Sequence, residues 1–131
     1  MEEALKRFES AAHTRAQGAA AEDEAERWLR AAGYEILERN LFTPVGEIDV
    51  VAREGDTLCF VEVKARAGPA CGPAIEAVHA GKQRRLTRAA ALYVTEHGFS
   101  GPCRFDVLGL DREPTGWRAT LIRNAFEARW R

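Results

Sequence analysis

Hydrophobic residues recur every three to four positions in two parts of the chain, which is the spacing of a helix with one buried face. In residues 18–32, Ala25, Leu29 and Ala32 lie on one such stripe. Gly33 follows them, at the position where a helix C-cap is expected. The pattern therefore predicts a first helix over this segment.

A second helix is predicted to begin at about Ile75 or Gly81 and to end at His97, with Gly98 as its terminating residue. A loop over residues 68–73 separates it from the preceding apolar run. Its buried stripe consists of Leu86, Ala89, Ala90 and Tyr93.

Short runs rich in β-branched and aromatic residues, bounded by turn residues, predict strands between and after the helices. Gly55 and Asp56 supply a two-residue hairpin turn between two of them. A short tail helix is predicted near residues 124–130. The predicted strands cover residues 34–41, 46–53, 57–66, 103–110 and 117–122.

The resulting order is α-β-β-β-α-β-β, in which hairpins give antiparallel neighbours and the helical crossover gives a parallel pair. This order predicts an α/β fold with a mixed central sheet flanked by helices. At 131 residues the chain fits a single domain, and residues 1–15 are interpreted as a flexible or helical N-terminal extension.

The predicted hairpin carries charges inside its strands. Counting back along both strands from Glu54 and Thr57, which flank the two-residue turn, sets Asp49 opposite Glu62. By strict alternation, the other side of the hairpin is wholly apolar and must be covered. That side consists of Ile48, Val50, Ala52, Cys59, Val61 and Val63.

Two opposed carboxylates about 5 Å apart destabilise a sheet unless a positive charge offsets their repulsion. One candidate is a divalent cation such as Mg²⁺, held by Asp49 and Glu62 and in contact with substrate phosphate. Another is Lys64, which lies two residues beyond Glu62 on the same face. The alternative without chemistry is a salt-bridge ladder, in which Lys64 lies opposite Glu47 and bridges to Glu62 while Asp49 is solvated at a strand end.

Composition excludes several classes of protein. Hydrophobic content of 46% and charged content of 30% are those of an ordinary globular domain. No apolar run is long enough to span a membrane and no signal peptide is evident, so a cytoplasmic location is expected. The three cysteines, Cys59, Cys71 and Cys103, have neither disulfide nor zinc-site spacing and are expected to be reduced and mostly buried.

Charge is distributed unevenly along the chain. A formal net charge of -1 does not indicate a uniformly basic nucleic-acid binder, but residues 64–88 contain one acid, Glu76, among many bases. This segment is the candidate surface for a polyanion, and a solvated helix face is the alternative. Its basic residues are Lys64, Arg66, Lys82, Arg84, Arg85 and Arg88.

The pattern D…E-x-K, formed by Asp49, Glu62 and Lys64, resembles the active-site motif of the PD-(D/E)XK, restriction-endonuclease-like nuclease superfamily. Nearly the whole chain is also similar to the YraN family of small bacterial proteins. The matching segments are GEIDVVA (46–52), FVEVKAR (60–66), ERN (38–40), CRFDVL (103–108) and NAF (124–126).

The resemblance implies a restriction-endonuclease-like αβββαβ core and an endonuclease activity dependent on Mg²⁺ or Mn²⁺. It also implies that Asp49, Glu62, the Val63 carbonyl and Glu22 of the first helix are metal ligands, and that Lys64 acts on the water or the phosphate. Archaeal-type Holliday junction resolvases are similar in architecture, and by analogy with such dimeric enzymes a homodimer is expected.

Three further residues have two interpretations each. Glu22 either joins the metal site or is favoured by the dipole of its helix. Lys82 either reaches a phosphate or extends along the edge of the core, and Gln83 is a weaker candidate for the same nucleic-acid groove. Asp106, inside a predicted strand, either pairs with an arginine such as Arg104 or belongs to a site.

The function expected from these observations is metal-dependent hydrolysis of phosphodiester bonds in DNA. Structured or branched DNA is favoured as the substrate because no element for reading base edges is evident. The alternative is a non-catalytic protein on a nuclease scaffold that binds nucleic acid or a protein partner.

Overall fold

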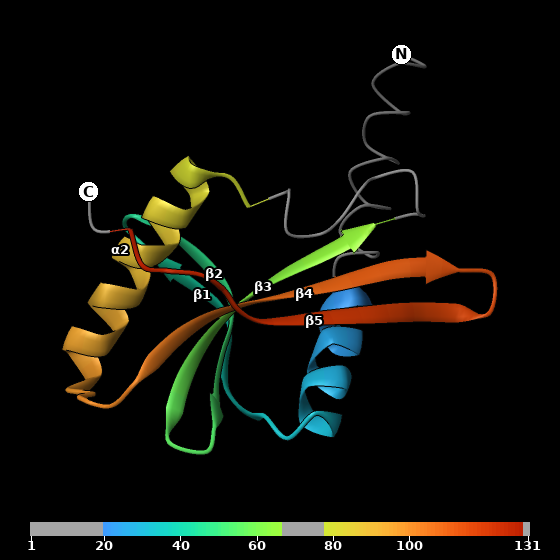
Figure 1. The fold of residues 1–131 in the computed structure, drawn as a ribbon, viewed down its shortest axis with the longest axis horizontal. Coiled ribbons are helices and arrows are strands. Elements are labelled where there is room, and N and C mark those ends of the chain that lie inside the picture. Colours follow the sequence, from blue (N-terminus) through green and yellow to red (C-terminus); the bar gives the residue numbers. More distant parts are fainter. Residues whose placement is uncertain (1–19, 67–77, 130–131) are drawn as a thin grey trace, which may run out of the picture.

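The structure is a computed structural model that describes residues 20–66 and 78–129 (Figure 1). The predicted N-terminal extension, the loop at 68–73 and Cys71 lie outside the described residues. A first helix covers residues 20–31. The elements that follow are β1 (Glu35–Thr43), β2 (Gly46–Glu54), β3 (Thr57–Arg66), α2 (Ala80–His97), β4 (Cys103–Glu113) and β5 (Gly116–Phe126).

The five strands form one sheet in the order of the chain, β1-β2-β3-β4-β5. All neighbours are antiparallel except β3 and β4, which are parallel and are joined through α2. The β2–β3 turn has two residues, since Glu54 pairs with Thr57 and Gly55 takes a φ of 60°. The predicted mixed sheet and αβββαβ order are therefore confirmed.

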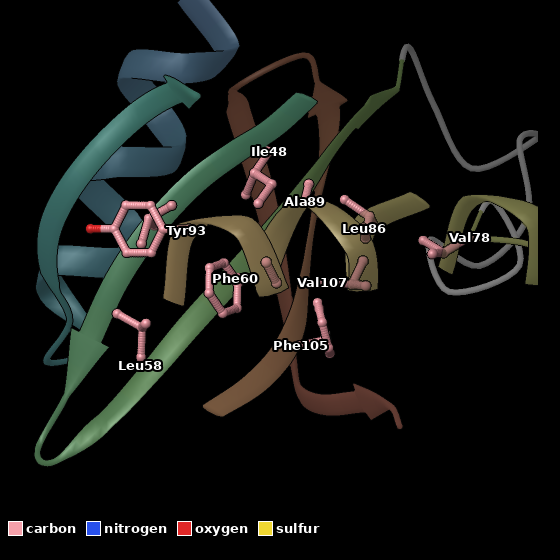
Figure 2. Packing of buried hydrophobic residues seen from close by; sticks show 11 residues of the cluster. Ile48, Leu58, Phe60, Val78, Leu86, Ala89, Tyr93, Phe105 and Val107 are labelled. Carbon is pink, nitrogen blue, oxygen red and sulfur yellow. The ribbon is translucent and has the colours of Figure 1, made fainter. Parts of the chain in front are cut away.

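Two separate apolar clusters hold the helices on opposite faces of the sheet. The first helix contributes Ala21, Ala25 and Leu29 to the cluster that contains Val50 and Val61. Helix α2 packs on the other cluster, around Phe60 and Tyr93 (Figure 2). Burying each large side chain of this kind contributes roughly 1.5–3 kcal/mol to stability. The sheet is thus covered on both sides by amphipathic helices.

Helix α2 begins and ends with local caps. The His79 Nδ1 accepts a hydrogen bond of 3.2 Å from the Lys82 N–H, which anchors the first turn. Gly98 adopts a left-handed conformation with a φ of 61°, and its N–H donates to the Thr95 carbonyl. These caps set the helix so that the Lys82 backbone is fixed close to the sheet.

Strict alternation along β2 predicts that Ile48 shares a face with Val50 and Ala52, and this prediction is wrong. Ile48 lies in the α2 cluster together with Val51, beside Ala89 and Leu86 in Figure 2. Val50 and Ala52 face the first helix. The strand therefore changes its facing between Ile48 and Val50, at Asp49.

The predicted tail helix at 124–130 is also wrong for the described residues, because β5 continues to Phe126 and residues 127–129 are not helical. Asn124 has a positive φ of 51° opposite a register shift in β4. Phe126 then stacks on Phe105, with ring centroids 4.9 Å apart. Tertiary contacts with β4 therefore override the local helical preference.

Asp106 is fully buried at this irregularity. Its carboxylate accepts hydrogen bonds from Tyr34 Oη (2.6 Å), Arg104 Nε (2.8 Å) and the Asn124 N–H (2.8 Å). Arg104 also donates to Glu54 Oε1 at 2.8 Å. The predicted Arg104 pairing is thus confirmed, and Asp106 links β4, β5 and the segment that follows the first helix.

Membrane-spanning helices and cysteines can be assessed for residues 20–66 and 78–129. Neither helix there combines the length and the apolar character that crossing a bilayer requires. Cys59 is buried and Cys103 is exposed, and both are free thiols. The exposure of Cys103 differs from the expectation of mostly buried cysteines.

Candidate active site

Asp49 of β2 and Glu62 of β3 lie next to each other where these two strands separate. The β2–β3 pairing runs from Glu54–Thr57 to Val50–Val61, and Asp49 and Glu62 are the residues that follow it on the two strands. Their carboxyl groups interact with each other. The Asp49 Oδ2 accepts a hydrogen bond of 2.8 Å from the Val63 N–H. The predicted juxtaposition of the two acids is therefore present, with Asp49 tied to the backbone of β3.

Asp49 is left out of the pairing between β1 and β2. The pairs Arg39–Val50 and Leu41–Ile48 flank Asn40 and Asp49, for which the described sheet has no pair. Asn40 has a positive φ of 53°, a conformation that asparagine tolerates better than most residues. The local bend explains how Asp49 can reach both sides of the sheet.

The ionisation of Asp49 is strongly perturbed. Burial and the neighbouring Glu62 carboxylate raise the pKa of Asp49 to about 7, against an ordinary value of 3.8. The Val63 N–H acts in the opposite direction but is outweighed. A carboxyl group with this pKa beside a second, buried carboxyl is typical of a functional site.

Two lysines face Glu62, whose side chain is 6% exposed. Lys64 Nζ lies 3.7 Å from the Glu62 Oε1, and Lys82 Nζ of α2 contacts the same oxygen. Burial and the adjacent Lys82 lower the pKa of Lys64. Burial opposes the charge on Lys82, but the hydrogen bond to Glu62, the contact with Lys64 and the charges of Glu62 and Asp49 together outweigh burial and raise the pKa of Lys82. The site is thus a compact cluster of two acids and two amines.

Two small cavities meet at Asp49. One of about 170 Å³ opens toward α2 and is bordered by Asp49, Glu62, Lys82 and Arg85. The other, of about 150 Å³, opens toward the first helix and is bordered by Asp49 and Glu22. A larger cavity of about 490 Å³ lies elsewhere, against the C-terminal half of α2, and neither acid lines it. The Asp49 side chain can therefore be reached from the side of α2 and from the side of the first helix.

Glu22 lies on the same cavity as Asp49, and neighbouring residues of β1 hold it there. The Asn40 Nδ2 donates to the Glu22 Oε2 at 3.0 Å, and the Arg39 Nη2 lies 3.6 Å from that oxygen. We did not identify Asn40 and Arg39 as site residues from the sequence. The only signal was their place in the family-like segment ERN, since the bend at Asn40 is a tertiary feature.

The donor set fits a hard divalent cation. Mg²⁺ is commonly held by one or two carboxylates while it keeps several waters, and Asp49 and Glu62 form such a pair with buried negative charge. Among residues 20–66 and 78–129, no three His, Cys, Asp or Glu side chains gather as a metal-binding group. Glu22 therefore lies near the two carboxylates but does not form a three-ligand site with them.

The residues predicted to bind nucleic acid divide into two sets. Arg66 is engaged by Asp111, with Nε 3.1 Å from Oδ1, and Gln83 bonds the Val78 carbonyl and Arg129. The remaining candidates lie on the first turns of α2 beside the acidic site. In that set Lys82 borders the cavity, Arg85 borders it and is exposed, Arg84 is half-buried and Arg88 is exposed.

Comparison with known proteins assigns the chain to a family. Residues 21–110 match the family described as "Uncharacterised protein family UPF0102". The chain belongs to this family. The resemblance to YraN-type proteins drawn from segments such as GEIDVVA and FVEVKAR is thereby confirmed.

Individual UPF0102 relatives match almost from end to end. The chain is 48% identical to a UPF0102 protein of Symbiobacterium thermophilum over 117 residues, which cover 88% of this chain and 99% of the relative. It is 40% identical to one of Magnetococcus marinus over 115 residues, 86% of this chain and 93% of the relative.

Among solved structures, Pyrococcus furiosus SfsA in complex with Ca²⁺ is similar to the UPF0102 chain with a TM-score of 0.36 and 20% identity. The match covers 84% of this chain and 62% of SfsA, so the chain spans less than two thirds of that protein.

The raised pKa of Asp49 predicts a pH dependence of stability in this UPF0102 protein. Between about pH 4 and pH 7, Asp49 is ionised in the unfolded chain but protonated in the folded protein. The folded state then binds more protons, so the free energy of unfolding that this group contributes falls as pH rises through the window.

An Asp49→Asn variant lacks this titration. Relative to the parent, the free energy of unfolding of the variant is expected to increase from about pH 4 to about pH 7, because only the parent loses stability over this range. Urea denaturation at several pH values measures it. A difference that stays constant across the window would contradict the raised pKa.

Proposed function

We propose that this protein is a metal-dependent nuclease of the PD-(D/E)XK type that hydrolyses phosphodiester bonds in DNA. Structured or branched DNA is the proposed substrate, and Mg²⁺ or Mn²⁺ the proposed cofactor. One observation carries the proposal. Asp49 and Glu62 meet on neighbouring strands with Lys64 Nζ 3.7 Å from Glu62, in the D…E-x-K pattern of this superfamily.

Each member of the cluster has a role in this proposal. Asp49 and Glu62 would hold the cation, and Glu22 borders the second cavity, from which it can assist through water. When bound, the cation supplies positive charge opposite the phosphate and lowers the pKa of a water. The Lys64 ammonium orients the attacking water or stabilises the charge that develops on the phosphate.

The surroundings suit a negatively charged polymer. Arg85 borders the cavity that opens toward α2, and Arg88 lies exposed one turn further along the same helix. Side chains three apart on a helix are neighbours, so these guanidinium groups can follow a phosphate backbone that enters the site. Contacts of this kind favour binding to DNA without reading its sequence.

The experiment is a cleavage assay on duplex, flap and four-way DNA with Mg²⁺ or Mn²⁺, and with a chelator as the negative condition. Lys64→Met is expected to lower the cleavage rate by about 100-fold, because it removes one preorganised positive group from the transition state. Arg53→Met replaces an exposed base of β2 and serves as the matched control. Metal-dependent cleavage that Lys64→Met leaves unchanged would contradict the assignment.

A second candidate function is supported by the contacts of Glu62. Lys64 and Lys82 already place two ammonium groups at one of its oxygens, so the acids are partly neutralised without a cation. This favours a non-catalytic DNA-binding protein on a nuclease scaffold. Salt-sensitive DNA binding without cleavage in the same assay would select this candidate.

A further inference from the structure

We propose that Lys82 is an exchangeable counter-ion of the acidic site, an inference that rests on the proposed function. Its ammonium occupies Glu62 while no cation is bound, competes with the incoming metal, and on displacement turns to the substrate phosphate. The motivating contact joins Lys82 Nζ of α2 to the Glu62 Oε1 of β3.

The contact brings together two parts of the fold. Glu62 is a buried acid of β3, whereas Lys82 is supplied by the first turn of the helix that covers this face. Lys82 is therefore separate from the D…E-x-K segment. The tertiary fold brings this positive charge from α2 to the two acids of the β2–β3 hairpin.

Only the side chain of Lys82 has to move for the exchange. Its backbone N–H is held by the His79 cap at 3.2 Å, so α2 stays in place. The Lys82 side chain has a flexible four-carbon stem and is 26% exposed, so its ammonium can move into the cavity. Displacement of the ammonium therefore needs no rearrangement of the sheet.

A cation on Glu62 and an ammonium on the same oxygen exclude each other by like-charge repulsion in a partly buried site. The cavity of about 170 Å³ gives the displaced group a destination, because Lys82 and Arg85 both border it. Lys82 and Arg85 are three apart on α2, so they lie next to each other. Together they would form a positive rim for a phosphate group beside the bound cation.

The test uses calorimetric titration of the full chain with Mn²⁺, without DNA. Lys82→Met keeps the length of the side chain and removes its charge. It is expected to tighten Mn²⁺ binding by about tenfold, within the usual range of coupling between two competing ligands. Arg53→Met removes an exposed charge of β2 and is expected to leave Mn²⁺ affinity unchanged.

A second measurement follows the displaced ammonium. In Ca²⁺, used to avoid cleavage, Lys82→Met is expected to bind four-way DNA more weakly than the parent and with a smaller dependence on salt. Crystals of the unaltered protein with and without Mn²⁺ cover the case in which the variant fails to fold. The Lys82–Glu62 contact is expected to be present without Mn²⁺ and broken with it.

The outcomes separate this inference from the proposed function. Unchanged or weaker Mn²⁺ binding by Lys82→Met overturns the exchange and leaves the nuclease proposal standing. Binding by Lys82→Met but not by the parent supports the exchange and counts against a metal enzyme. If neither protein binds Mn²⁺, both proposals are overturned, as is the exchange if the Lys82–Glu62 contact persists in crystals with bound Mn²⁺.

Discussion

Asp49→Asn is expected to lower metal-dependent DNA cleavage by at least about 10³-fold, the loss that corresponds to several kcal/mol of transition-state stabilisation. The same change is expected to raise the melting temperature of the metal-free protein at pH 8. Asparagine keeps an oxygen that can accept the Val63 N–H, but it removes the partly buried charge beside Glu62. A gain of about 1 kcal/mol corresponds to roughly 3–5 °C in a domain of this size.

The opposite signs of the two effects make the experiment informative. Replacing a residue that has a purely structural role lowers the stability of the protein, whereas replacing a strained functional group raises it. Glu35→Gln changes an exposed acid of the neighbouring strand β1 that borders neither cavity at Asp49, and it is the control for charge alone. Cleavage at the parental rate by Asp49→Asn would exclude this carboxylate from the reaction, and a lower melting temperature would show that it is structural.

Asp106→Ala is expected to lower the free energy of unfolding by about 3–5 kcal/mol, because it breaks a buried pair and leaves Arg104 without that partner. The corresponding fall in melting temperature is about 10–20 °C. Asp106 has 0% exposure and also accepts from Tyr34 and the Asn124 N–H. Its removal therefore loosens β4, β5 and the chain after the first helix together.

Chemical denaturation of the two proteins measures the loss. Glu113→Ala is the matched control, because Glu113 lies on the same strand but makes a more exposed pair with Arg118 at 3.3 Å. Exposed pairs contribute roughly 0–1 kcal/mol, so the control is expected to change stability little. Equal losses in the two variants would be incompatible with the network described for Asp106.

Local patterns were sufficient to predict most of the architecture. The Gly55–Asp56 turn predicted the register of the hairpin from Glu54–Thr57 to Val50–Val61, directly after which Asp49 and Glu62 follow on the two strands. The helical stripes of Leu29 and Leu86 predicted the helices that cover the two faces. These signals are readable because spacing along the chain alone decides which side chains share a face.

Tertiary contacts decided what local patterns could not. The change of facing at Asp49 in β2 lies opposite Asn40 of β1, and the extension of β5 to Phe126 includes Asn124. Both asparagines have a positive φ. A register argument assumes regular pairing and cannot locate such irregularities.

The sequence by itself therefore determined the αβββαβ order and the hairpin that carries the two acids and Lys64, because turns and most of the periodicity are local properties. The tertiary structure alone decided that Lys82 meets Glu62, that Asn40 holds Glu22, and that Asp106 is enclosed. Several of these contacts join residues that are distant in sequence, since 18 positions separate Asn40 from Glu22 and 72 separate Tyr34 from Asp106. These side chains come into contact only when both helices are packed on the sheet.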